Sequence, residues 1–270
     1  MIRLGHIRYS NCYPIHEPFL GGRAEWLQLV EGSPAFLNEL LARAELDVAP
    51  CSSIELARHP GEYRALRGLC IASDEAVESI AVVSRAPLEG LAGSRVALPT
   101  ASATARVLLR ILLELRHGIA PRWEDFDQEA EDPLMDSDVA AALFIGDIAL
   151  RRLPGEGERR TDLGSEWFHW TGLPFVFALW QLRDEARSEP HLPELHRRML
   201  AARDGLSRSA DALARRAAGR FGIAASRLAA YWRGIRYTLD PPALRGLTRF
   251  YELAADLDEV AAVPRVRMWG

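Results

Sequence analysis

Short apolar segments of strand length alternate with amphipathic segments along most of the chain. This alternation predicts an α/β fold with largely parallel sheets. The expected strands span residues 2–7, 46–49, 69–72, 79–84, 95–98, 140–145 and 175–180. Beyond about residue 192 the pattern is helical almost to the end, because Ala, Leu and Met recur at helical spacing over 192–219.

Residues that favour helix ends mark where several helices begin. Ser33-Pro34 offers a capping hydroxyl followed by a proline, and Ser52-x-x-Glu55 fits a capping box. Asp240-Pro241 is expected to begin a helix that runs through 253. The helix after Ser33 is expected to bury the apolar stripe of Phe36, Leu37, Leu40 and Leu41.

Two changes in composition divide the chain. The first is the stretch 85–93, which carries Pro and Gly where a crossover needs them. Residues 151–162, farther along the chain, are expected to form a charged surface loop. A second change comes at Leu173-Pro174, just before an apolar aromatic segment. We therefore expect a larger α/β lobe formed by 1–84 plus 174–270, with the C-terminal helices, and a smaller α/β lobe, 85–173, inserted into it.

Composition narrows the chemistry. All 33 basic side chains of this 270-residue chain are arginine, which excludes mechanisms that need a lysine amine. The formal net charge of -4 argues against a general nucleic-acid or anionic-membrane binder. Three cysteines make no disulfide framework, and no leader or 18-residue apolar segment is found. A cytoplasmic location is therefore expected.

Several familiar catalytic motifs are missing from the sequence. It contains no H-E-x-x-H, paired C-x-x-C, G-x-S-x-G or G-x-G-x-x-G motif. His191 and His196 are five residues apart on an expected helix and point to different faces, which favours solvated histidines over a metal site. We expect neither a metal nor a dinucleotide cofactor.

Small polar groups follow several expected strands. They are Ser10-Asn11, Cys51-Ser52-Ser53, Ser102-Ala103-Thr104 and Gly146-Asp147. In open α/β sheets ligands bind beyond the strand ends, and helix N-termini offer free N–H groups to anions. Each hydroxyl taken alone is more simply a helix cap, whereas together they favour a cleft for a small dicarboxylate.

Asn11 is one of two asparagines in the chain, the other being Asn38. Asn38 lies within an expected helix and is expected to be solvated. Asn11 lies in a tight turn, where asparagine is common for backbone reasons. From its position alone, a turn role for Asn11 is favoured over a ligand contact.

At these residues the sequence resembles the chorismate dehydratases of the futalosine route to menaquinone. The opening segment IRYSNCYP at 7–14 and the segment ELDVAPCSSIE at 45–55 carry the resemblance most clearly. It continues through 68–73, 78–80, 102–113, 144–150 and 166–180. Each motif alone is weak, but their order along residues 1–255 is specific.

The resemblance implies a periplasmic-binding-protein-like fold of type II, in which a double crossover joins two α/β lobes around a cleft. It also implies a lyase, of the hydro-lyase class, that converts chorismate to 3-[(1-carboxyvinyl)oxy]benzoate. No cofactor is implied, because aromatisation of the ring supplies the driving force. The implied partner is the small molecule chorismate, with neither nucleic acid nor a membrane.

Matching residue by residue, the resemblance places Asn11 beside the reacting ring carbons. An amide is no general base, so its implied role is orientation, and the base would be a water or the substrate's own enolpyruvyl carboxylate. The implied substrate-binding residues are Ser10, Ser52, Ser53, Ser79, Ser102, Ala103, Thr104, Gly146 and Asp147. Asp147 is a candidate contact for the leaving hydroxyl, and Arg8 and Arg236 are candidate carboxylate partners.

Two other functions compete with this interpretation. The sister enzyme 1,4-dihydroxy-6-naphthoate synthase shares the fold, but carries a catalytic histidine where this chain has Gly146 and opens with a Pro-Asn-Asp motif. The other alternative is a non-catalytic small-anion binding protein on the same fold. The expected absence of an export leader argues against an exported receptor.

Overall fold

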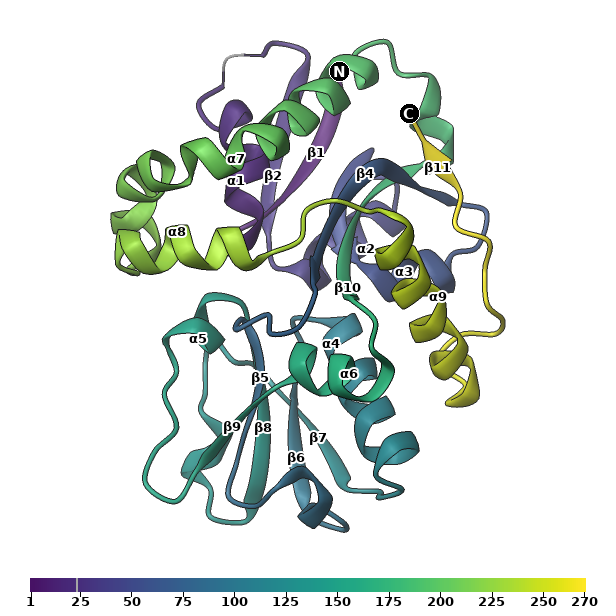
Figure 1. The fold of residues 1–270 in the computed structure, drawn as a ribbon. Coiled ribbons are helices and arrows are strands. Elements are labelled where there is room, and N and C mark those ends of the chain that lie inside the picture. Colours follow the sequence, from purple (N-terminus) through teal and green to yellow (C-terminus); the bar gives the residue numbers. More distant parts are fainter. Residues whose placement is uncertain (23) are drawn as a thin grey trace.

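The computed structural model describes residues 1–22 and 24–270, which form two α/β lobes, each built on its own sheet (Figure 1). In spatial order, the first sheet contains β11 (Met268–Trp269), β4 (Tyr63–Ser73), β10 (Phe175–Arg183), β3 (Val48–Ser52), β1 (Ile2–Ile7) and β2 (Leu27–Gly32). The second contains β7 (Arg122–Phe126), β6 (Arg95–Pro99), β8 (Val139–Ile145), β5 (Ile80–Ser84) and β9 (Arg159–Asp162). The expected two-lobed α/β fold is confirmed.

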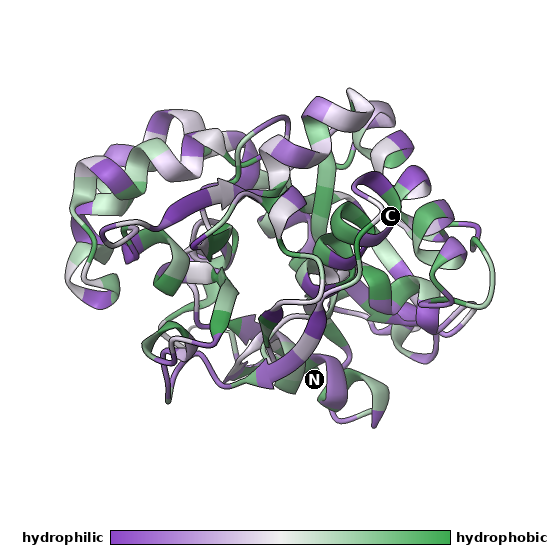
Figure 2. Cartoon of the chain, turned by 90° about the horizontal axis from the view of Figure 1, so that it is seen from below, coloured by the Kyte–Doolittle hydropathy of each residue, from purple (hydrophilic) through white to green (hydrophobic). Residues whose placement is uncertain are grey.

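The helices cover the sheets and form the C-terminal part of the chain. They are α1 (Tyr13–His16), α2 (Pro34–Ala42), α3 (Ser53–Arg58), α4 (Ala103–Arg110), α5 (Gly146–Arg151), α6 (Leu163–Thr171), α7 (Leu192–Phe221), α8 (Ala225–Gly234) and α9 (Pro241–Asp256). The 3-10 helices are η1 (Ser10–Cys12), η2 (Glu17–Phe19), η3 (Leu88–Gly90), η5 (Pro133–Met135) and η6 (Asp184–Ser188), and η4 (Ile111–Arg116) is a π-helix that follows α4 directly. Hydrophilic and hydrophobic residues alternate along the helices, as their partly exposed position requires (Figure 2). No helix in the described part of the chain is long and apolar enough to cross a membrane.

The sheets are mixed, so the expectation of largely parallel sheets is wrong. Strand β10 runs antiparallel to both neighbours, β3 and β4, and β5 runs antiparallel to β8 and β9. The reason is that each of these strands follows a crossing between the lobes and enters its sheet from the side of the other lobe (Figure 1). Apolar periodicity carries no information on that direction.

The chain passes from the first sheet to the second over residues 74–79 and returns over 172–174. Strand β5 belongs to the second sheet, although the sequence analysis assigned 79–84 to the larger lobe. The division into 1–84 plus 174–270 and 85–173 stays a prediction. We propose that the first boundary lies within 74–79, where the chain changes sheets.

Three local expectations need correction. Phe36 is 45% exposed, whereas Leu37, Leu40 and Leu41 are buried as expected. The segment 151–162 is not all loop, because its end pairs with β5 as the edge strand β9. The Ser52 side chain does not cap α3, and Glu55 pairs with Arg58 instead of completing a capping box.

The returning segment before β10 is held by α9. Helix α9 begins where expected, because the Asp240 carboxylate accepts the Ala243 N–H at 3.1 Å. A methyl group built on Gly246 of α9 would collide with the Pro174 carbonyl oxygen. Glycine therefore lets α9 pack directly on the backbone of the second crossing.

This close approach predicts opposite effects for two helix glycines. Gly246→Ala should lower the free energy of unfolding by about 1–3 kcal/mol, because the added methyl meets a backbone atom that cannot move freely. Gly205→Ala, in α7, should raise it by about 0.5–1 kcal/mol, because the new methyl meets no described atom within 4 Å outside its own helix turn and adjoining residues. Urea unfolding of both variants measures the difference, and a Gly246→Ala protein as stable as Gly205→Ala would contradict the contact.

Candidate active site

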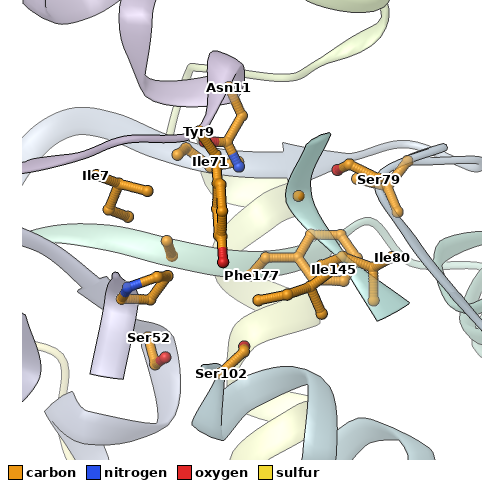
Figure 3. A pocket seen from close by; sticks show the side chains of 14 residues that line it. Ile7, Tyr9, Asn11, Ser52, Ile71, Ser79, Ile80, Ser102, Ile145 and Phe177 are labelled. Carbon is orange, nitrogen blue, oxygen red and sulfur yellow. The ribbon is translucent and has the colours of Figure 1, made fainter. Parts of the chain in front are cut away.

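A pocket lies between the two sheets and is lined in part by the first crossing of the chain, at Val77 and Ser79 (Figure 3). About 480 Å³ of space in the pocket and at its open mouth is not filled by protein atoms. Asn11 lies at one end, Ser52 and Ser102 lie at the opposite end, and the Tyr9 side chain extends between them. The lining residues are Ile7, Tyr9, Asn11, Pro34, Ser52, Ile71, Val77, Ser79, Ile80, Ser102, Ile145, Gly146, Phe177 and Ala178.

The structure brings half of the expected site residues to this pocket. Those that line it are Asn11, Ser52, Ser79, Ser102 and Gly146. The expected site residues that do not line the pocket are Ser10, Ser53, Ala103, Thr104 and Asp147. Each lies one or two positions along the chain from an expected residue that does. Their roles toward a substrate stay predictions, but the contacts below describe where their polar atoms are engaged.

The turn η1 holds Asn11 through its backbone. The Tyr237 hydroxyl donates to the Asn11 carbonyl at 2.7 Å, and the Trp232 indole N–H donates to the Ser10 carbonyl at 2.8 Å. The Asn11 side-chain oxygen is buried and has no hydrogen-bond partner among the described residues. A buried carbonyl oxygen without a donor costs free energy, so this atom has unmet capacity to accept a hydrogen bond.

Tyr9 joins the two lobes across the pocket. Its hydroxyl accepts a hydrogen bond from the Gln128 amide at 3.0 Å, and the Gln128 side-chain oxygen accepts the Ile145 N–H at 3.0 Å. Burial raises the pKa of Tyr9 to about 12, so the phenol is neutral near pH 7. The Tyr9 ring packs against Gly146, where φ is +63° and a methyl group would lie 2.7 Å from ring carbons.

The Ser52 peptide is fixed from two sides. Its N–H donates to the Asn38 side-chain oxygen at 3.3 Å, and its carbonyl accepts the Gln181 amide at 2.9 Å. The expectation that Asn38 is merely solvated is therefore wrong. The hydroxyl of Ser102, across the pocket floor, accepts the Ala105 N–H at 3.4 Å and caps α4.

Ser53 and Thr104 contact each other beneath the pocket. The Ser53 hydroxyl donates to the Val176 carbonyl at 2.7 Å, and Thr104 accepts the Ile54 N–H at 3.2 Å. The two hydroxyl oxygens lie 3.3 Å apart. Because Ser53 already donates to Val176, the hydrogen between the two hydroxyls comes from Thr104. These groups tie α3 to α4 across the lobes.

Ser10 and Asp147 form a second contact between the lobes. The Ser10 N–H lies 3.1 Å from both carboxylate oxygens, and the Ser10 hydroxyl also donates to one of them. Burial raises the pKa of Asp147, while the hydrogen bonds from Ser10 oppose the shift. The Asp147 carboxylate thus faces Ser10, and Asp147 does not line the pocket.

Charged side chains lie in a neighbouring cleft, but none of those described lines the pocket. Of the described residues that line it, Tyr9 is the one with an ionisable side chain. Arg8, a candidate carboxylate partner, lies with Arg151 in a neighbouring cleft that shares Tyr9 with the pocket. Arg236 forms ion pairs with Asp74 and Asp240 instead.

His6, Cys12 and His16 form a buried cluster whose potential ligand atoms lie within 4.8 Å of one another. The Trp180 indole N–H donates to His16 Nε2 at 2.7 Å, so neutral His16 carries its proton on Nδ1, 3.0 Å from His6 Nδ1. Burial lowers the pKa of His6 to about 4 and that of His16 as well. A neutral His16 cannot accept from Trp180 and also bind a metal through Nδ1, so the cluster fits a hydrogen-bond chain better than a metal site.

Tyr9 and the apolar walls of the pocket were not expected from the sequence. Tyr9 lies within the opening motif, but no pattern indicates that its ring reaches the second lobe. The missed apolar residues include Ile7 and Ile145, which end β1 and β8. Their position at strand ends is the one signal that the sequence offers.

The sequence matches the family described as menaquinone biosynthesis over residues 2–256. It is 34% identical over 266 residues to the chorismate dehydratase of Thermus thermophilus, covering 92% of this chain and 93% of that protein. It is 29% identical over 179 residues to the chorismate dehydratase of Campylobacter jejuni, covering 64% of each chain.

Solved structures show the same fold. A protein from Archaeoglobus fulgidus superposes with a TM-score of 0.77 at 19% identity, covering 96% of this chain and 98% of that one. The periplasmic aliphatic sulphonate binding protein SsuA of Escherichia coli superposes with a TM-score of 0.69 at 14% identity, covering 100% of this chain and 92% of that one. The expected periplasmic-binding-protein-like fold is thus confirmed. Since the family match spans almost the whole chain, this protein belongs to the menaquinone biosynthesis family.

Proposed function

We propose that this protein is a lyase that dehydrates chorismate to 3-[(1-carboxyvinyl)oxy]benzoate in the futalosine route to menaquinone. The chorismate dehydratases named among its relatives support this assignment. The observation that carries it is the pocket itself, which joins apolar walls and neutral polar groups and offers no protein base. The proposal keeps the cytoplasmic location expected from the sequence.

The reaction removes a proton and a hydroxyl from neighbouring ring carbons. The C–H bond at the carbon bearing the ether breaks, and its electron pair enters the ring. The C–O bond at the adjacent carbon breaks, and the hydroxyl leaves with a proton as water. Aromatisation of the ring makes this loss favourable, so the protein's task is to bind and orient the substrate.

The proposed proton acceptor is the substrate's own enolpyruvyl carboxylate or a water. Asn11, Ser52, Ser79 and Ser102 cannot act as bases near pH 7, and burial holds the pKa of Tyr9 near 12. A carboxylate confined in an apolar pocket is poorly solvated and therefore a stronger base than in water. The neutral lining supports a mechanism in which the substrate supplies the base.

Asn11 is proposed to orient the ring carbons that react. Its unpartnered buried oxygen would accept the hydrogen bond of the substrate's ring hydroxyl, which is the leaving group. The hydroxyls of Ser52 and Ser102, at the opposite end of the pocket, would hold a carboxylate together with the N-terminus of α4. Ser79, at the first crossing, would contact the substrate from the side.

Gly146 argues against the sister reaction. A catalytic histidine at this position would place its Cβ within 2.7 Å of the Tyr9 ring carbons. The left-handed backbone at Gly146 also disfavours any side chain there. This packing supports the dehydratase over a 1,4-dihydroxy-6-naphthoate synthase.

Incubation of the purified protein with chorismate tests the proposal directly. Chromatography should show 3-[(1-carboxyvinyl)oxy]benzoate forming in proportion to enzyme and time, without added metal or redox cofactor. Boiled protein is the control for spontaneous breakdown. If chorismate binds in a calorimeter but no product forms, the protein is a binding protein and the proposal is wrong.

Asn11→Ala should separate activity from stability. We expect kcat to fall by about a hundredfold or more, because a preorganised hydrogen bond at the reacting carbons is lost. The melting temperature should stay the same or rise, because the substitution removes an unpartnered buried oxygen.

Asn38→Ala is the matched comparison, because Asn38 accepts the Ser52 N–H. It should cost about 1 kcal/mol of stability. Unimpaired turnover in Asn11→Ala, or a fall in its melting temperature matching that of Asn38→Ala, would make Asn11 a turn residue.

Gly146→Ala should weaken substrate binding through Tyr9. Both Gly146→Ala and the control Gly118→Ala place alanine at a φ near +65°, which should cost each about 1–2 kcal/mol of stability. Only at Gly146 does the methyl displace the Tyr9 ring, since at Gly118 it meets no described atom within 4 Å outside the adjoining residues. Only Gly146→Ala should therefore raise KM for chorismate, and equal KM values in the two variants would refute the contact.

A further inference from the structure

The contact between Ser10 and Asp147 lies directly beside the pocket. Ser10 precedes Asn11 in η1, and Asp147 follows Gly146 at the start of α5. The two residues come from different lobes, yet each is bonded to a residue that lines the pocket. Movement of one lobe against the other would therefore act on the pocket through this contact.

The polar atoms of η1 are divided between the lobes. In the first lobe, Trp232 donates a hydrogen bond to the Ser10 carbonyl and Tyr237 donates one to the Asn11 carbonyl. The second lobe holds the N–H and hydroxyl of Ser10 through the carboxylate of Asp147. Hydrogen bonds to a buried carboxylate are about twice as strong as neutral ones, and Ser10 and Asp147 are 0% and 7% exposed.

We infer that Asp147 is a positioning residue, which fixes the orientation of Asn11 through Ser10 when the lobes are closed. With the lobes apart, η1 keeps its carbonyl contacts but loses every bond to its Ser10 N–H and hydroxyl, so Asn11 can turn away from the ring carbons. Closure therefore completes the site. The inference rests on the proposed dehydratase function.

This role differs from direct contact with the leaving hydroxyl, for which Asp147 was only a candidate on the sequence. Its carboxylate oxygens are engaged by Ser10. Asp147 lines the neighbouring cleft, with Arg8, Glu129 and Arg151, and not the pocket. If Asp147 acts through Ser10, a change at Asp147 should affect turnover much less once Ser10 has also been changed.

A double-mutant cycle tests the inference. Asp147→Asn keeps the shape of the side chain but removes its charge, and should lower kcat for chorismate by about tenfold to a hundredfold with little change in KM. Ser10→Ala should lower kcat less, because the Ser10 N–H still reaches Asp147. The two losses should be far from additive in the double variant. Glu129→Gln, which removes a carboxylate from the same cleft, should leave kcat unchanged.

The opposite results are equally specific. A wild-type kcat in Asp147→Asn overturns the inference, and so does full additivity of the two losses, which would indicate direct contact with substrate. An activity loss that merely parallels a fall in melting temperature also overturns it, and Ser10→Ala provides that comparison if Asp147→Asn folds poorly.

Small-angle scattering provides a measurement that needs no turnover. Asp147→Asn should have a larger radius of gyration than the wild type and Glu129→Gln, because the closed arrangement loses a contact between the lobes. Equal radii would overturn the link to closure. If the wild-type protein does not act on chorismate, only the proposed function is refuted. The scattering comparison still tests the contact between Asp147 and Ser10.

Discussion

The Tyr9 ring of the first lobe packs against Gly146 of the second, and the shape of the pocket depends on this approach. A side chain at residue 146 would push the ring away, and with it the hydroxyl that Gln128 holds. Gln128 in turn binds the backbone at Ile145, which ends β8. Because residue 146 is glycine, the second lobe can fix the position of the Tyr9 ring, which belongs to the first lobe.

The polar groups around the pocket differ in how fully they are used. Ser10 pairs with Asp147, Ser53 with Thr104, and the Ser52 peptide with Asn38 and Gln181. The Asn11 side-chain oxygen is buried and finds no hydrogen-bond partner in the described part of the chain. An unpaired buried oxygen costs free energy, and a hydrogen bond from the proposed leaving group would remove that cost at Asn11. The neutral lining then suits a substrate that brings its own charge and its own base.

Local sequence signals predicted the elements well where they are self-contained. Strand β1 has the expected bounds, and α9 begins at the expected Asp240 cap. The missed elements depend on distant partners. The edge strand β9 is polar and forms a strand because it pairs with β5. Phe36 belongs to the expected apolar stripe of α2 but is exposed, because it lies outside the face of α2 that packs on the core. Asn11, Ser52, Ser79, Ser102 and Gly146 were found because they occur in ordered motifs, whereas the aliphatic walls resemble any buried strand end.

The sequence by itself determined the two-lobed α/β architecture, the family and the motif residues, because apolar periodicity, caps and motif order are local properties of the chain. The tertiary structure decided which motif residues face the pocket and which face each other. Asp147 and Ser10 are 137 positions apart, and the hydrogen bond that redirects the Asp147 carboxylate forms only when the crossings bring the two sheets together. The antiparallel entry of β10 was likewise decided there, since strand direction follows from the route of the whole chain and not from the composition of the strand.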